Sequence, residues 1–392
     1  MYLTKEEEKI LEGEEGFARQ KAMEILVALG DIYGASNLID IEGAQVSGVS
    51  YKTIGDAGLD FLDEFSKDAK VKVPTTLNPA GMDLEEWKSM NVNPEFASKQ
   101  LEILKCFDRM GLQLTCTCTP YLIGNIPSYN SHVSWGESSA IVFANSILGA
   151  RTNREGGMSS LASALIGKTP NYGLHLDESR GADFLIQVEE DLNTYMYGVL
   201  GYHVGKITMQ PAFIFSKRPS LEGLKLLCAS LGASGSVALF HAKDITPEWR
   251  GEFEKLEKIE VTRKELEEEQ TNFRNADKID LITFGCPHCT INEIINIKNL
   301  LEKEKEKPNC EVWIFTNYQT KKLAERMGLK ESLKKKNAKI ISDTCMIVSP
   351  IEEMGIKSIA TNSTKACLYA PTMCGFNVYL GDERECIRLG MK

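Results

Sequence analysis

The sequence lacks the long apolar runs and the apolar leader that membrane-spanning and exported proteins carry. No stretch of about 18 apolar residues occurs, and the N-terminus, MYLTKEEEKILEGEEGF, opens on charge. We therefore expect a cytoplasmic protein. The chain also lacks an excess of positive charge, since 45 Lys and Arg stand against 55 Asp and Glu and give a net charge of -10. Nucleic acid and membranes are therefore not expected partners.

Histidine is scarce, whereas cysteine is not. The five histidines show no metal-ligand spacing, which argues against a histidine-based zinc site; they are His132, His175, His203, His241 and His288. Eleven cysteines in a chain of 392 residues without an export signal argue against a disulfide framework. The thiols are therefore either small core side chains or ligands.

Helix and strand signals outline the beginning of the chain. Thr4 and Glu7 fit a capping box, and apolar residues at helical spacing predict a single N-terminal helix to about residue 30. The segment LIDIEGAQVSGVSY then predicts a strand that runs into a glycine-containing turn, with a helix starting near Ser50 or Thr53. A turn of this kind leads directly into a helix N-terminus, where backbone N–H groups are free.

Later segments predict more strands that end in polar loops. One strand is expected to end at Asn78 and Pro79 and another near Cys118, and a helix is expected from about 136 to 148. Toward the C-terminus, strand-like and helical segments alternate, which indicates a parallel sheet with βαβ crossovers; the strand-like segments are IDLITFG, CEVWIFTN, AKIISD, SIATNS and NVYLG. Ligands of such sheets bind at the carboxyl ends of the strands.

These patterns predict an α/β protein of two or three domains, at roughly 150 residues per domain. A charge-dense segment, EFEKLEKIEVTRKELEEEQTNF, marks a boundary near residue 270. We expect an N-terminal α/β region over 1–135, a central α/β region over 136–270 and a C-terminal Rossmann-like region over 271–392.

Three cysteines share one sequence context. Cys118, Cys286 and Cys345 each follow a short β-like run and stand in a polar loop, in LTCTCTPY, ITFGCPHC and IISDTC. Three thiolates on three such loops can converge on a metal or cluster that keeps one coordination position open, as Lewis-acid chemistry requires. Their distant spacing matches no local ligand motif, so inert buried cysteine is the competing interpretation.

The CPHC sequence supports a third interpretation. Cys286 and Cys289 lie between a predicted strand and a predicted helix, as the dithiols of thioredoxin-type proteins do, and a helix N-terminus lowers a thiol pKa. A redox dithiol would leave Cys118 and Cys345 unexplained.

Several polar positions are suited to an anionic ligand. Gly48, Val49 and Ser50 precede a predicted helix, where backbone N–H groups favour an anion, although a plain tight turn explains them equally. Glu137 and Ser138 open another helix and either cap it or contact a substrate. The cations Arg151, Arg154 and Lys365 stand in small-residue loops and either bind anionic oxygens or pair with neighbouring carboxylates.

Several longer segments resemble the aconitase X family, and most closely its archaeal two-subunit type. They are CTPYLIGNIP, WGESSAIVFANSILGARTNREGG, PNYGLHLDESRGAD, FGCPH, SDTC and TNSTKACLYAP. The resemblance runs from EGAQVSGVSY to the last predicted strand. It implies an aconitase-like fold of several α/β/α units, with the active site at the carboxyl ends of parallel strands.

The resemblance also implies a site. It places an iron-sulfur cluster, [4Fe-4S] in the archaeal type, on Cys118, Cys286 and Cys345. Residues at matching positions would hold the substrate; they are Gly48, Val49, Ser50, Asn78, Pro79, Glu137 and Ser138. Arg154 and Lys365 are added on their charge. Gln45 stands where many relatives have histidine.

The implied reaction is dehydration of (R)-5-phosphomevalonate to trans-anhydromevalonate 5-phosphate, a step of the archaeal mevalonate route to isoprenoids. The chain length leaves no room for the small swivelling domain of the family, so a separate small subunit is expected as partner and as the source of the catalytic base. No base is assigned within this chain. The alternatives are an aconitase-like or hydroxyproline dehydratase acting on another hydroxy acid, and the CPHC dithiol.

Overall fold

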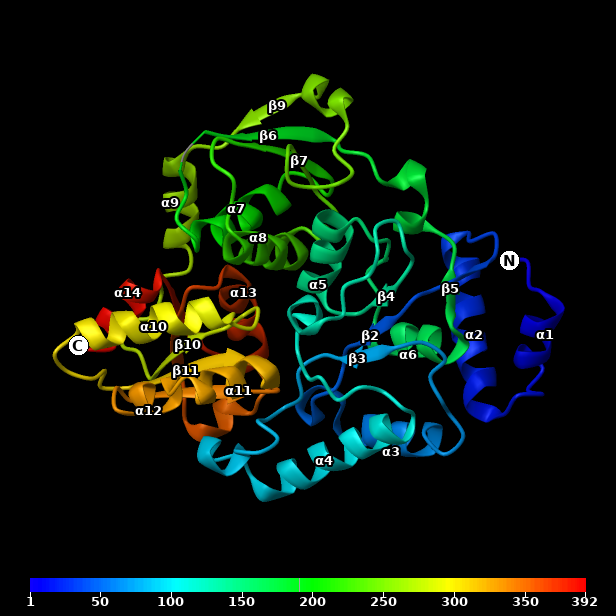
Figure 1. The fold of residues 1–392 in the computed structure, drawn as a ribbon, viewed down its shortest axis with the longest axis horizontal. Helices are drawn as coiled ribbons and strands as arrows, with labels where there is room; N and C mark the ends of the chain where they lie inside the picture. The colour runs from blue at the N-terminus through cyan, green and yellow to red at the C-terminus, as the bar shows by residue number, and fades with distance from the viewer. Residues whose placement is uncertain (190) are drawn as a thin grey trace.

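The computed structural model describes residues 1–189 and 191–392 and has the α/β architecture that the sequence predicts. Within these residues the strands form four sheets, three of them wholly parallel. Figure 1 shows the sheets as separate layers around a central group of helices that includes α5 (Ser138–Phe143) and α8 (Leu221–Ser234).

A parallel three-stranded sheet of order β3-β2-β4 lies at the centre of the first part of the chain. The antiparallel pair β1–β5 lies beside it and ties residues 38–40 to residues 168–170. The elements of this part are α1 (Lys5–Leu11), α2 (Phe17–Tyr33), β1 (Leu38–Asp40), β2 (Ala44–Val46), α3 (Tyr51–Phe65), β3 (Thr75–Leu77), α4 (Pro94–Arg109), β4 (Ser134–Trp135), α5, α6 (Gly157–Ile166) and β5 (Lys168–Pro170). The division of the chain expected at residues 135 and 270 stays a prediction.

Two predictions in this part are wrong. The single N-terminal helix is two helices, because Gly13 and Gly16 adopt φ values of 90° and 94° between α1 and α2, a region that interrupts a right-handed helix. The strand expected to end near Cys118 is absent from the described residues. Gln113 makes an isolated bridge to Thr76, and the φ of 42° at Cys116 ends the extended backbone.

The parallel four-stranded sheet, of order β8-β7-β6-β9, follows. Its elements are β6 (Phe184–Val188), α7 (Met196–Gly205), β7 (Pro211–Phe215), α8, β8 (His241–Ala242), β9 (Lys258–Glu260) and α9 (Arg263–Thr271). Helix α8 is buried over most of its length because its sequence, LEGLKLLCASLGAS, is apolar or small on nearly every face. It packs against α7, α5 and α13 (Thr364–Cys374) and so joins the sheets.

The C-terminal part is a parallel five-stranded sheet of order β12-β11-β10-β13-β14, as predicted from the alternating segments. Its elements are β10 (Leu281–Phe284), α10 (Ile291–Lys303), β11 (Glu311–Thr316), α11 (Tyr318–Arg326), α12 (Leu329–Lys334), β12 (Ala338–Ser342), β13 (Ser358–Thr361), α13, β14 (Asn377–Leu380) and α14 (Glu383–Leu389). No helix among the described residues is long and apolar enough to cross a membrane.

Candidate active site

Three cysteine loops meet between the sheets. Cys286 follows β10 and Cys345 follows β12, while Cys118 stands in the irregular segment before β4. Cys118 and Cys286 are buried, and Cys345 is partly exposed. Burial raises the pKa of each thiol, and the neighbouring thiols add to the effect: Cys345 and Cys286 raise the pKa of Cys118, and Cys286 raises that of Cys345, to about 12. That the three thiols hold one cluster stays a prediction.

The backbone before Cys286 explains part of this arrangement. Gly285 has a φ of 104°, and a Cβ there would lie 2.1 Å from the carbonyl oxygen of Phe315 on the neighbouring strand β11. Only glycine allows this close approach. The chain can therefore leave β10 at once and turn Cys286 toward the other two loops.

A buried ion pair lies beside the thiols. The Lys365 ammonium contacts the Glu137 carboxylate and donates to Oγ of Ser138 at 2.9 Å, while Nδ2 of Asn78 donates to Oε2 of Glu137 at 2.8 Å. Burial opposes ionisation, but Lys365 and Asn78 hold the pKa of Glu137 below its ordinary value. Lys365 also lowers the pKa of Cys286, so the pair and the thiols form one site.

Glu137 and Lys365 are placed by helix N-termini. Glu137 is the N-cap of α5 and accepts the backbone N–H of Ser139, and Lys365 stands in the first turn of α13, which Ser363 caps. The two interpretations weighed for Glu137, capping and ligand contact, are therefore compatible, because one carboxylate oxygen caps the helix while the other faces Asn78.

The glycine turn and the Asn78–Pro79 loop lie against the Cys345 loop. Ser50 caps α3 through Lys52 N–H and donates its own hydroxyl to the carbonyl of Val348 at 2.7 Å. The backbone N–H of Ala80, next to Pro79, donates to the carbonyl of Asp343 at 2.7 Å. Gly48 is exposed and has a φ of 73°, whereas Val49 is buried. The structure thus brings the predicted anion-binding turn next to the cysteines.

The arginines are placed differently. Arg154 is exposed and donates to the carbonyl of Gly232 at 2.8 Å, at the edge of a separate cavity of about 490 Å³ that Tyr33, Tyr172 and Met209 also line. Its interpretation as a substrate ligand stays a prediction. Arg151 pairs with Asp177, the alternative considered for it.

Sequence reasoning missed two buried residues under the cysteine loops. Lys225 of α8 is fully buried, donates to the carbonyl of His288 at 2.7 Å and pairs with Glu293. Although burial opposes the charge, Glu293 keeps the pKa of Lys225 above its ordinary value. His288 is also fully buried, and burial lowers its pKa to about 4. For Lys225 the sequence offered one signal, a lysine inside an otherwise apolar helix. For His288 it offered no local signal.

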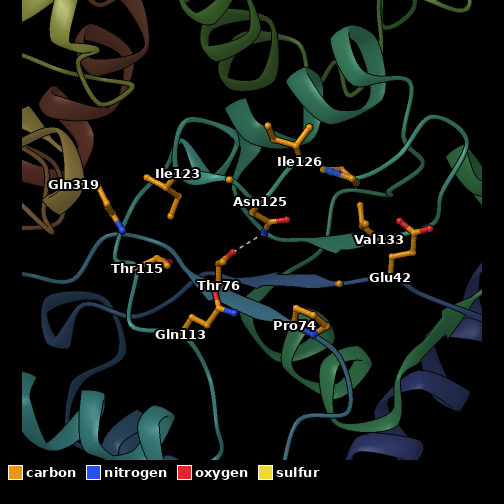
Figure 2. A pocket seen from close by; sticks show the side chains of 13 residues that line it. Glu42, Pro74, Thr76, Gln113, Thr115, Ile123, Asn125, Ile126, Val133 and Gln319 are labelled. Atoms are coloured by element: carbon orange, nitrogen blue, oxygen red, sulfur yellow. Dashed lines mark hydrogen bonds between the residues drawn. The ribbon is translucent and has the colours of Figure 1, made fainter.

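The cavity drawn in Figure 2 lies away from this site. It has a volume of about 360 Å³ and is lined by mostly uncharged residues, among them Thr76, Gln113, Thr115, Asn125 and Gln319. Residues that line it, such as Gly43, Pro74 and Val133, precede β2, β3 and β4. The cysteine site therefore occupies the carboxyl edge of the three-stranded sheet and this cavity the amino edge.

The donor set fits an iron-sulfur cluster better than a single metal ion. Thiolates are the ligands of such clusters, and three of them leave one position open. No group of three or more His, Cys, Asp and Glu in the described residues is arranged to hold one metal ion. Cys118 and Cys286, two of the three thiols, are buried.

The CPHC pair does not have the properties of a reactive dithiol. Cys286 and Cys289 pack into different core clusters, and burial raises the pKa of both thiols. A redox-active cysteine needs an exposed thiol with a lowered pKa.

Comparisons with known proteins cover nearly the whole chain. Three family models match in succession: the aconitase X first domain over residues 1–178, the second domain over 182–271 and the third domain over 279–392. A phosphomevalonate dehydratase large subunit of Methanocaldococcus jannaschii is 49% identical over 404 residues, a match that covers 99% of this chain and 100% of that protein.

A solved structure and a more distant relative add to this. The crystal structure of Thermococcus kodakaraensis aconitase X in its holo-form matches with a TM-score of 0.91 at 49% identity and covers 99% of both chains. A cis-3-hydroxy-L-proline dehydratase of Pseudomonas aeruginosa is 32% identical over 398 residues, which are 97% of this chain but 68% of that protein.

Proposed function

We propose, since this chain belongs to the aconitase X family, that it is the large subunit of a phosphomevalonate dehydratase, a hydro-lyase that removes water from (R)-5-phosphomevalonate. The family suggested by the sequence motifs is thereby confirmed. One structural observation carries the proposal: three thiols, two of them buried and one partly exposed, share the carboxyl edge of the sheets with the buried Glu137–Lys365 pair. A β-hydroxy acid needs both features, a Lewis acid for its hydroxyl and a cation for its carboxylate.

The proposed cofactor is a [4Fe-4S] cluster held by Cys118, Cys286 and Cys345. When bound, its open iron supplies Lewis-acid chemistry toward the hydroxyl oxygen and makes hydroxide a better leaving group. The mutual influence of the three thiols and their burial support this assignment.

The substrate carries a carboxylate at one end and a phosphate at the other, and the site offers a place for each. Lys365 and Ser138 would hold the carboxylate, whose negative charge grows as the neighbouring carbon loses its proton. Asn78 orients Glu137, and with it the ammonium. The phosphate would lie at Gly48, Val49 and Ser50, where the N-terminus of α3 favours an anion.

The electron count of the dehydration is simple. A base takes the proton from the carbon next to the carboxylate, the C–H electron pair forms the double bond, and the hydroxyl leaves as hydroxide with the C–O electron pair. One proton, equal in number to the one that the base took up, then converts the hydroxide to water. We assign the base to a small partner subunit. Two facts support a partner: relatives at 47–49% identity are named large subunits, and the hydroxyproline dehydratases, at 68% coverage, carry additional chain.

The test is anaerobic co-expression of this chain with the candidate small subunit. Iron, sulfide and visible absorbance are measured on the sample that is assayed with 5-phosphomevalonate and, separately, with cis-3-hydroxy-L-proline. Turnover of the phosphate ester with iron bound is expected. Iron with turnover of hydroxyproline alone would replace the substrate, and a reconstituted sample without iron would overturn the cluster assignment.

A matched pair of cysteine variants sharpens this test. Cys345 and Cys310 are both partly exposed, but Cys310 packs at the edge of another core cluster. Cys345→Ser should lose cluster absorbance and turnover together. Cys310→Ser should keep both, and equal behaviour of the two variants would contradict the ligand assignment.

A further inference from the structure

His288 contacts the loops of all three candidate ligands. Its Nδ1 lies 2.9 Å from Oγ1 of Thr117, the residue before Cys118, and its Nε2 lies 2.8 Å from the carbonyl oxygen of Thr344, the residue before Cys345. His288 itself follows Cys286 by two positions. The ring and both threonines are fully buried, each with 0% of its surface exposed. One imidazole therefore joins three segments that are far apart in the sequence.

The chemistry of its partners fixes the state of the ring. The Thr344 carbonyl can only accept, so Nε2 carries the proton and Nδ1 is an acceptor. The Thr117 hydroxyl then donates to Nδ1, while its oxygen accepts the backbone N–H of Thr119 at 3.1 Å. Both ring nitrogens are satisfied in one tautomer of a neutral imidazole, so the two hydrogen bonds are directional and need no counter-charge.

The backbone of His288 is used as fully as its ring. Its N–H donates to Sγ of Cys118 at 3.3 Å, and its carbonyl accepts from the buried Lys225 ammonium at 2.7 Å. Gln45 holds the same cysteine loop from the other side, because its Nε2 donates to the carbonyl of Thr117 at 3.1 Å. The backbone N–H and the carbonyl of His288 are therefore both hydrogen-bonded, in addition to the two nitrogens of its ring.

We propose that His288 is a positioning residue that sets the spacing of the Cys118, Cys286 and Cys345 thiols and so determines how firmly the chain holds its cluster. The inference rests on the proposed function, because the cluster belongs to that proposal. The ring carries out this role by linking the Cys118 and Cys345 loops to the Cys286 loop. Groups that orient metal ligands in this way typically change metal affinity by about 10–100-fold when they are replaced.

Three substitutions separate the two ring contacts. His288→Asn places its amide oxygen near the position of Nδ1 and keeps the bond from Thr117, while it gives up the bond to Thr344. His288→Gln reaches the position of Nε2 and keeps the bond to Thr344 alone. His288→Leu removes both. All three retain the backbone N–H to Cys118, so they test the ring and not the chain path.

The readout is cluster retention and not turnover. Each variant is purified anaerobically with its small subunit and reconstituted, iron per chain is counted, and the decay of visible absorbance is followed after a chelator is added. His288→Leu should lose its cluster about 10–100-fold faster than the wild type, with the Asn and Gln variants between them. Thr117→Val should resemble His288→Gln, and combining the two should add nothing further, because both remove the same bond.

His241→Gln is the control, since His241 is a buried histidine that bonds to the carbonyl of Arg180 and contacts no cysteine loop in the described structure. It should hold its cluster as the wild type does. Equal decay rates in wild type and His288→Leu would overturn the inference, as would equally fast loss in His241→Gln. If His288→Leu does not fold, wild-type decay in both the Asn and Gln variants would overturn it. A wild type that takes up no iron would instead overturn the proposed function.

Discussion

Two buried lysine–carboxylate pairs join the first part of the chain to the five-stranded sheet. They differ in whether the polar atoms around them all have hydrogen-bond partners. Lys321 and Asp83 lie 2.6 Å apart with side chains 0% and 2% exposed. The Asp83 carboxylate also accepts the backbone N–H and hydroxyl of Ser342 and the backbone N–H of Glu86. Both oxygens of the Asp83 carboxylate are therefore hydrogen-bonded, and this pair fixes the interface.

The Lys365–Glu137 pair differs in its surroundings. The Lys365 ammonium has two acceptors in the described structure, Glu137 and Ser138, just as Lys321 has Asp83 and Glu86. Oδ1 of the neighbouring Asn78 is buried and has no hydrogen-bond partner there. Buried polar groups are ordinarily satisfied, so a site that leaves donors and acceptors over has capacity for a ligand. The unpaired Asn78 oxygen distinguishes the proposed substrate-binding pair from the structural one.

The largest expected effect concerns activity. Lys365→Met should lower kcat/KM for 5-phosphomevalonate by about 100- to 1,000-fold, because one cation that stabilises developing negative charge is lost. Iron per chain should stay at the wild-type value. Steady-state kinetics and iron analysis of the two-subunit enzyme measure both quantities. Wild-type kinetics in this variant would show that Lys365 has only a structural role like that of Lys321.

The next effect concerns stability. Lys321→Met leaves the Asp83 charge buried without its cation and should lower the free energy of unfolding by about 3–5 kcal/mol. Denaturant titration of the apo chain measures this change, and kcat of the folded enzyme should not change. The double variant Asp83→Asn with Lys321→Met should recover part of the loss. An activity defect equal to that of Lys365→Met would remove the distinction between the pairs.

Sequence reasoning reached the sheets and the cysteine loops because both are local patterns. Strands followed by polar loops are visible in ITFGCPHC and IISDTC, and the βαβ alternation fixes which edge the loops share. It could not find the partner of Glu137, because Lys365 lies 228 positions away and is brought near by packing between sheets. His288 was missed for the same reason, since its contacts cross 171 and 56 positions.

A smaller effect appears at acid pH. Burial opposes ionisation, but Lys321 and backbone N–H groups hold the pKa of Asp83 below its ordinary value. A carboxyl with a lowered folded pKa adds stability above its unfolded pKa of about 3.9, and that stability is lost as the pH falls through the folded pKa. The wild type should therefore lose stability below about pH 4, with a shallower slope in Asp83→Asn. Unfolding titrations at several pH values measure the slopes, and equal slopes would contradict the assignment.

The smallest effect is expected for Lys322, the residue after Lys321. Lys322 follows Lys321 in α11 and pairs with Glu85 at 2.7 Å, but the side chains are 37% and 47% exposed. Exposed pairs are screened by water and contribute about 0–1 kcal/mol, so Lys322→Met should change the free energy of unfolding by no more than about 1 kcal/mol. Iron content and kcat/KM should also be unchanged. Both lysines lie in α11 and both are replaced by Met. The difference between the two changes in the free energy of unfolding therefore reports on the burial of the ion pair. A loss for Lys322→Met as large as that for Lys321→Met would mean that the stability of this interface comes from the packing of α11 rather than from the buried charge.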